Sequence, residues 1–191
     1  MKTEKVFGIL VMISLLFKWM HWPGGSLILI LSLSTLSFLY LVLAFYLFCD
    51  KTLSNQNIAL SIVSGIFLSI IPIALVFKFQ YWPGAKVMLL LACLTSPVLV
   101  VLSWFLGREA REELKGYYKN MVIRTAVLSS LAVLFFFLPS AVLINMQYGD
   151  DPELAKLKVL HYTHPDNEEY AAEHDAYVEK LDSTRLNNGN K

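Results

Sequence analysis

Five long apolar runs, separated by short polar connections, dominate the pattern of this chain. A helix needs about 20 apolar residues to cross the ~30 Å hydrocarbon layer of a bilayer. The pattern therefore predicts an all-α, polytopic membrane protein with five transmembrane helices. Their expected ranges are 6–22, 27–48, 58–82, 87–106 and 121–146.

The first run follows a basic start with Lys2 and Lys5, which is also how secretory signal peptides begin. No small-residue cleavage pattern follows the run, and the second copy of the repeat described next has a clear apolar run, residues 58–82, at the matching position. We therefore interpret residues 6–22 as a short membrane helix whose Lys18 side chain extends to the headgroups.

A ten-residue stretch, FKWMHWPGGS at Phe17–Ser26, returns as FKFQYWPGAK at Phe77–Lys86 with five identical positions. Each copy lies between two apolar runs, so the repeating unit is a helical hairpin closed by a Trp-Pro-Gly turn. Proline disfavours helix in the residue before it, and glycine supplies the positive φ of a tight reversal. The candidate turn residues are Phe17, Lys18, His21, Trp22, Pro23 and Gly24 in the first copy, and Phe77, Lys78, Tyr81, Trp82, Pro83 and Gly84 in the second.

The turn side chains fit a membrane interface. Tryptophan is enriched there, and His21 and Tyr81 are amphipathic in the same way. Lys18 and Lys78 lie one helical turn before the tryptophan, where an ammonium reaches headgroups, helix carbonyls or the indole ring. Interfacial anchoring is favoured over a ligand or ion role.

Small residues and prolines in the apolar runs indicate how the helices pack. Ser61, Gly65 and Ser69 are four residues apart, a small-xxx-small stripe that lets another helix approach closely. Pro72 and Pro97 predict kinks in the third and fourth spans.

The 107–120 connection is the most substantial polar segment between spans. Charges four residues apart extend the preceding helix into water until Gly116 ends it. Tyr117 and Tyr118 then return the chain to the interface.

Composition supports a membrane class and a polar tail. The chain is 56% hydrophobic and 16% charged, against about 25% charged residues in soluble domains. From residue 150 onward ten acidic residues face five basic ones. Asp151 followed by Pro152 predicts a helix start in this tail, and a second helix is expected after Pro165. The expected parts are a first transmembrane hairpin at 1–57, a second at 58–106, a cytoplasmic loop at 107–120, a fifth transmembrane helix at 121–148 and an acidic tail at 149–191.

Basic residues are distributed unequally between the two sides that five spans define. Lys2, Lys5, Lys51, Arg108, Arg111, Lys115 and Lys119 share one side. By the positive-inside rule this side is cytoplasmic. The sequence therefore predicts an inner-membrane protein with a cytoplasmic N-terminus and a periplasmic C-terminal tail.

Catalytic motifs are missing from the sequence: it has no phosphate-binding glycine loop, nucleophile elbow or metalloprotease spacing. No Asp or Glu lies in the interior of an expected span, where ion-driven transporters carry one. Cys49 and Cys93 are interpreted as small hydrophobic residues. One metal hypothesis joins His161 and His164 with Glu173 or Asp175, but Pro165 breaks the helix that would align the pair. We predict no cofactor and no metal.

The residues FKWMHWPGG, and less fully FKFQYWPGA, resemble the membrane hairpin of the GldL family, the inner-membrane motor subunit of gliding and type 9 secretion in Bacteroidota. The resemblance rests on Phe17, Lys18 and His21; Tyr81 replaces the histidine in the second copy. It implies a glutamate some fifteen residues after the histidine, for proton handling. Leu36 and Ser96 occupy those positions, and neither can ionise. The resemblance thus implies the hairpin and a Bacteroidota-type envelope, without the motor function.

Together these features predict a non-enzymatic inner-membrane protein, a structural or accessory subunit of a secretion- or gliding-like assembly. Its expected partners are the lipid bilayer, other membrane subunits or further copies of itself, and a periplasmic protein at the tail, with no nucleic acid. The alternative is a small-solute or ion transporter or channel, because duplicated hairpins and broken helices recur in transporters. An embedded enzyme is the third possibility.

Overall fold

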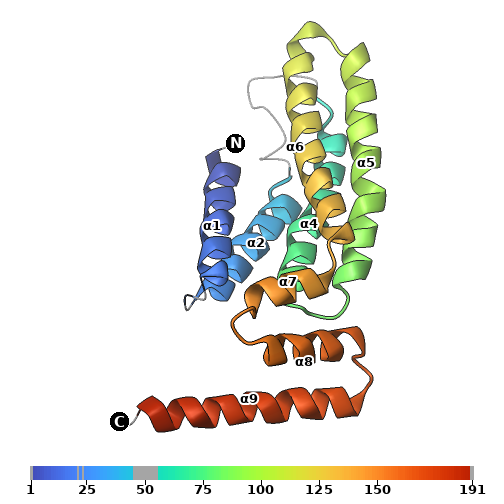
Figure 1. Ribbon diagram of the computed structural model, residues 1–191. Helices are drawn as coiled ribbons and strands as arrows, with labels where there is room; N and C mark the ends of the chain where they lie inside the picture. Colours follow the sequence, from blue (N-terminus) through green and yellow to red (C-terminus); the bar gives the residue numbers. More distant parts are fainter. Residues whose placement is uncertain (1, 21, 23, 45–55, 190–191) are drawn as a thin grey trace. The chain divides into compact units, whose positions relative to one another are not determined.

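The computed structural model describes residues 2–20, 22, 24–44 and 56–189. Within these residues the chain forms eight helices and no strand (Figure 1). They are α1 (Lys2–Trp19), α2 (Gly25–Val42), α4 (Ile58–Phe79), α5 (Ala85–Glu109), α6 (Glu112–Phe137), α7 (Ser140–Gln147), α8 (Pro152–Thr163) and α9 (Glu168–Gly189). The chain divides into two compact units, Met1–Leu138 and Pro139–Lys191.

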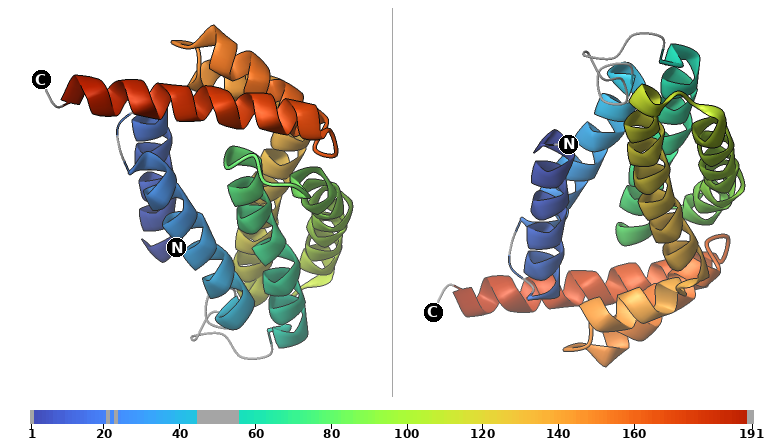
Figure 2. Two further views of the ribbon diagram at one scale, coloured as in Figure 1. Left: turned by 90° about the horizontal axis from the view of Figure 1, so that it is seen from below. Right: turned by 90° about the horizontal axis from the view of Figure 1, so that it is seen from above.

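Unit 1 is built around α4. This helix packs against α2, α5 and α6, while α1 packs against α2 and α5 pairs with α6 along its length (Figure 2). Leu68 and Ile71 of α4 are completely buried, as are Leu29 of α2 and Leu89 of α5. These contacts make α4 the most enclosed helix of the unit.

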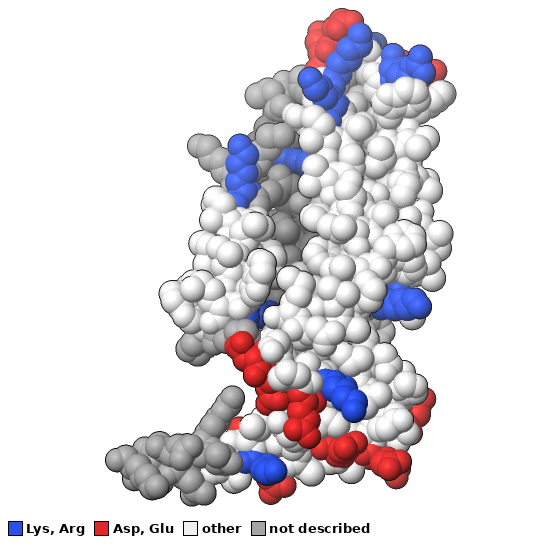
Figure 3. Space-filling view, viewed as in Figure 1, with Lys and Arg blue, Asp and Glu red and all other residues white. Residues whose placement is uncertain are grey.

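Four helices, α2, α4, α5 and α6, are long and apolar enough to cross a membrane. The described part of α1 falls outside this group because its 18 residues include Lys2, Glu4, Lys5 and Lys18. On the face of unit 1 in Figure 3, acidic and basic side chains lie toward the ends of α5 and α6, and the surface between them is apolar. The protein is therefore a multi-pass helical membrane protein.

The connection before the last span is shorter than the sequence predicted. The 107–120 segment is not a loop: α5 continues to Glu109, only two residues follow, and α6 begins at Glu112. Gly116 lies inside α6, in a sequence with Glu112 and Glu113 in the first turn, where acidic side chains favour a helix N-terminus. Tyr117 and Tyr118 are buried, and the Tyr117 hydroxyl shares a hydrogen bond with Ser61 of α4.

The last span also ends earlier than predicted. The expected helix at 121–146 is interrupted at Leu138, whose ψ of 117° is extended, and α6 stops at Phe137. Pro139 explains this, because its ring disfavours helical geometry in the preceding residue and it has no N–H to donate. The short helix α7 then belongs to unit 2, where it contacts α8.

Unit 2 contains α7, α8 and α9, with α8 contacting both neighbours. The predicted helix start at Asp151 and Pro152 is present: the Asp151 carboxylate accepts a hydrogen bond from the Leu154 N–H at 3.0 Å. The Tyr177 hydroxyl of α9 donates to the same carboxylate at 3.1 Å. Desolvation of the ring, this hydrogen bond and the negative charge of Asp151 together raise the pKa of Tyr177.

Candidate functional site

The turn between α4 and α5 is a helix-capping motif built from its sequence. The Trp82 N–H donates to the Phe77 carbonyl at 2.9 Å, and the Tyr81 N–H donates to the Lys78 carbonyl at 3.4 Å. Tyr81 has a left-handed backbone with φ +58°. This pattern is a Schellman motif. Such a motif often carries an apolar contact near the hydrogen bond that spans five residues, here the bond from Trp82 to Phe77. Here the Phe77 and Trp82 rings make that contact, edge to face at 5.2 Å.

The turn between α1 and α2 repeats this arrangement where it is described. The Trp22 N–H donates to the Phe17 carbonyl at 2.9 Å, and the two rings meet edge to face at 5.0 Å. His21 and Pro23 lie outside the described residues. The five-residue spacing from Phe to Trp in both copies is thus explained by capping: one hydrogen bond and one ring contact join the same two residues.

A glycine in each turn is the N-cap residue of the next helix. Gly24 and Gly84 precede α2 and α5 with φ of +90° and +87°, the left-handed region where glycine is unstrained. Nothing lies within 4 Å of a Cβ built at either position, so only the backbone angle selects for glycine. Gly25 differs, because a Cβ there would lie 2.7 Å from the Lys18 backbone nitrogen. At Gly25 it is the close approach of the two helices that excludes a side chain.

Lys18 joins the two turns. Its ammonium donates to the Phe79 carbonyl at the end of α4, and it lies 5.3 Å from the centre of the Tyr81 ring. The capping motif occupies the carbonyls of Phe77 and Lys78, so the Phe79 carbonyl is the one that a side chain has to satisfy. The Gln80 amide reaches back to the Ser26 carbonyl at 3.5 Å. The two copies of the motif therefore form one continuous surface, the paired turns.

Lys78 occupies the same motif position as Lys18 in a different environment. It is 6% exposed, and its side chain makes no hydrogen bond or ion pair with the described residues. The repeated sequence thus gives one bridging and one buried lysine, a difference that the identical residues did not predict.

Small residues lie where α4 meets its neighbours. A Cβ at Gly65 would be 2.6 Å from the Tyr40 carbonyl oxygen of α2 and 2.2 Å from the Ala44 Cβ just after that helix, so α2 and α4 approach closely there. The Ser37 hydroxyl of α2 donates to the Ser69 carbonyl at 2.6 Å, one residue from the carbonyl that Pro72 leaves without a helical donor. The Ser61 hydroxyl shares a 2.6 Å hydrogen bond with Tyr117 of α6.

The positions at which the resemblance implies a glutamate are enclosed. Leu36 of α2 is 8% exposed, and Ser96 of α5 is 1% exposed. The Ser96 hydroxyl donates to the Ala92 carbonyl within its own helix at 2.7 Å. Neither position presents an ionisable group.

The histidines of unit 2 are not arranged as the metal hypothesis requires, because His161 lies beside His174 and not beside His164. His161 stacks on His174, with ring centres 5.5 Å apart, and His164 instead contacts Thr163 at 3.0 Å. Because α8 ends at Thr163, His164 leaves the helix that carries His161. No group of three or more His, Cys, Asp or Glu side chains among the described residues is arranged to hold a metal ion.

Comparison with known proteins agrees with the helical membrane architecture. Residues 6–56, which cover α1 from its fifth residue onward, the first turn and α2, match the family model of the GldL N-terminal domain. The chain is a GldL-like membrane protein. No curated protein and no solved structure matched it.

Proposed function

We propose that this chain is a non-enzymatic subunit of a secretion- or gliding-type envelope assembly, and that its paired turns contact a partner protein at the extracytoplasmic membrane surface. The GldL-like first hairpin supports the type of assembly. The observation that carries the proposal is the Lys18 bridge, because it joins two turns sixty residues apart into a single surface.

The paired turns offer aromatic side chains of the kind that dominate protein interfaces. Trp19, Trp22 and Trp82 are 63%, 53% and 43% exposed. Tryptophan is enriched both in interface hot spots and at membrane surfaces, so these residues suit a partner bound where lipid and water meet. The capping motif fixes Trp22 and Trp82 against Phe17 and Phe77, which lowers the entropy lost on binding.

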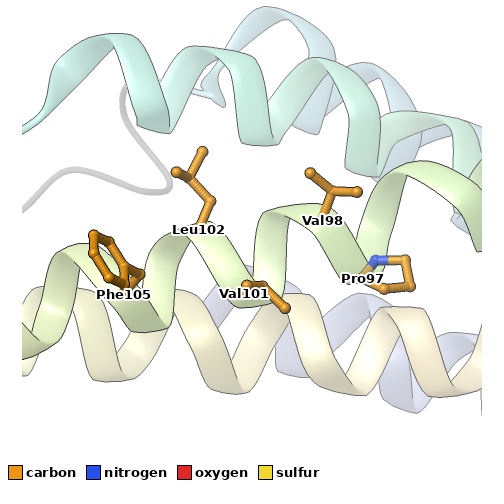
Figure 4. A pocket seen from close by; sticks show the side chains of 5 residues that line it. All are labelled: Pro97, Val98, Val101, Leu102 and Phe105. Carbon is orange, nitrogen blue, oxygen red and sulfur yellow. The ribbon is translucent and has the colours of Figure 1, made fainter.

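The outer face of α5 suits contact with lipid or another membrane subunit. Pro97, Val98, Val101, Leu102 and Phe105 line a shallow apolar cavity of about 490 Å³ (Figure 4). All five side chains come from this one helix, and none is polar. A lipid chain, a neighbouring subunit or a second copy of α5 fits such a surface.

The role proposed is structural, without a motor. A motor of the GldL type requires an ionisable group at membrane depth, and Leu36 and Ser96 stand at the corresponding positions of the two proposed repeats. In this proposal the duplicated hairpin is a scaffold that presents two copies of the turn to the partner.

Site-specific photocrosslinking tests this proposal in native membranes. A crosslinker at Trp22 or Trp82 is expected to capture one defined protein, whereas the same probe at Glu113, near the start of α6, is not. Capture of lipid alone from both turns would contradict a protein partner. Ion or solute flux through liposomes containing the purified chain would instead favour the transporter.

A further inference from the structure

A cavity of about 350 Å³ lies between α5 and α6 near their connection. Its lining includes three basic side chains, Arg108, Lys115 and Lys119, together with Trp104 and Tyr118. Figure 3 shows Lys and Arg side chains, with acidic side chains beside them, at this end of α5 and α6, above the apolar belt. The cavity therefore combines positive charge with a position at the edge of the membrane.

One hydroxyl in this cavity lacks a partner. Ser103 lines it, is completely buried and makes no hydrogen bond through its Oγ. Other hydroxyls of the two helices, those of Thr95, Ser96, Thr125 and Ser130, each donate to the carbonyl four residues earlier. A buried unsatisfied hydroxyl costs about 1–3 kcal/mol, so the Ser103 position is explained if a ligand supplies the missing acceptor.

The charges around the cavity leave a positive excess. Lys115 pairs with Glu112, so this basic residue is neutralised by its neighbour. The Arg108 guanidinium lies over the Trp104 ring at 4.7 Å, which orients it without neutralising it. Glu109 and Glu113 are also nearby in sequence, but neither lines the cavity. Arg108 and Lys119 remain as cations for a ligand.

We propose that this cavity binds the headgroup of an anionic phospholipid. Phosphate oxygens accept hydrogen bonds from Arg108, Lys119 and the Ser103 hydroxyl, while the acyl chains extend along the apolar faces of α5 and α6. Basic pockets between transmembrane helices recognise such headgroups, and an aromatic ring at the same depth is typical of the interface. The site lies at the opposite ends of α5 and α6 from the turn and is independent of the proposed partner contact.

Lipid titration of the full chain in mild detergent tests this site, with native mass spectrometry and the thermal unfolding midpoint as readouts. Cardiolipin or phosphatidylglycerol should bind and raise the midpoint, whereas phosphatidylcholine and inorganic phosphate should not. Arg108→Gln with Lys119→Gln should weaken anionic-lipid binding about thirtyfold, since each basic residue near a charged surface contributes about 1 kcal/mol. The matched control Lys86→Gln, at the far end of α5, should bind normally.

Ser103→Ala separates a ligand role from a packing role. Without lipid it should unfold at the same or a higher temperature than the unsubstituted chain, because a buried unsatisfied hydroxyl is removed, yet it should gain less stability from cardiolipin. Equal lipid binding by the double variant and the unsubstituted chain would overturn the proposal. Equal stabilisation by phosphatidylcholine, or by inorganic phosphate alone, would also overturn it.

Discussion

The ammonium of Lys18 in the first turn donates to the Phe79 carbonyl at the end of α4 and lies 5.3 Å from the Tyr81 ring centre. A lysine of one repeat thus completes the cap of the other, which makes the two hairpins interdependent. The same motif supplies both sides of this contact, the lysine from the first copy and the carbonyl and aromatic ring from the second.

Replacing Lys18 tests this bridge. Lys18→Met should keep the apolar stem but lose a charged hydrogen bond and a cation–π contact, at a cost of about 2 kcal/mol. Denaturant-induced unfolding in micelles measures the loss. Lys86→Met, at an exposed position on α5, should change stability little; equal effects of the two substitutions would show that Lys18 acts only as a surface charge.

Tyr81 should tolerate residues that accept a left-handed backbone. Its φ of +58° is unfavourable for most side chains, and asparagine and glycine accept it best. The yield of folded protein for Tyr81→Asn should therefore be close to that of the unsubstituted chain. The yield for Tyr81→Val should be clearly lower. Equal yields of the two variants by size-exclusion chromatography would contradict this turn geometry.

Glycine substitutions distinguish backbone angle from available space. Gly84→Ala should lower stability by about 1–2 kcal/mol although the Cβ meets nothing, because alanine at φ +87° is strained. Gly116→Ala, inside α6 and also with open space, should instead raise stability by up to about 1 kcal/mol. Thermal unfolding of both variants in one detergent gives the comparison, and the same sign for both would refute the explanation.

Gly65→Ala should separate α2 from α4. The added methyl would meet Ala44 and the Tyr40 carbonyl at distances that real contacts do not allow, and overpacking costs about 1–3 kcal/mol. Gly8→Ala, where nothing lies within 4 Å, is the matched control. A normal unfolding midpoint for Gly65→Ala would show that the two helices do not approach at this residue.

The helical membrane class and the positive φ of Gly24 and Gly84 follow from the sequence, because apolar length and turn chemistry are local properties. The first and last residues of the last span could not be predicted from the sequence. Gly116 is accommodated within α6, and Pro139 ends this helix although the apolar run continues beyond it. The Tyr81 backbone was also missed, although a Phe-to-Trp spacing of five residues in both copies is the signal of the capping motif.

Contacts between distant segments could not be read from the chain. The Lys18 bridge and the Ser61 hydrogen bond to Tyr117 depend on which helices become neighbours, and spacing within one helix does not contain that information. The cavity at Ser103 was missed for the same reason, because α5 and α6 each contribute part of its lining.

The central claim, that both turns form one surface on one side of the membrane, is tested most directly by cysteine labelling. In a chain carrying Cys49→Ser and Cys93→Ser, single cysteines replace Ser26, Lys86 or Lys115 and are exposed to an impermeant maleimide from either face. We predict that Ser26→Cys and Lys86→Cys react from the same face and that Lys115→Cys reacts from the other. Labelling of Ser26→Cys and Lys86→Cys from opposite faces would contradict the account.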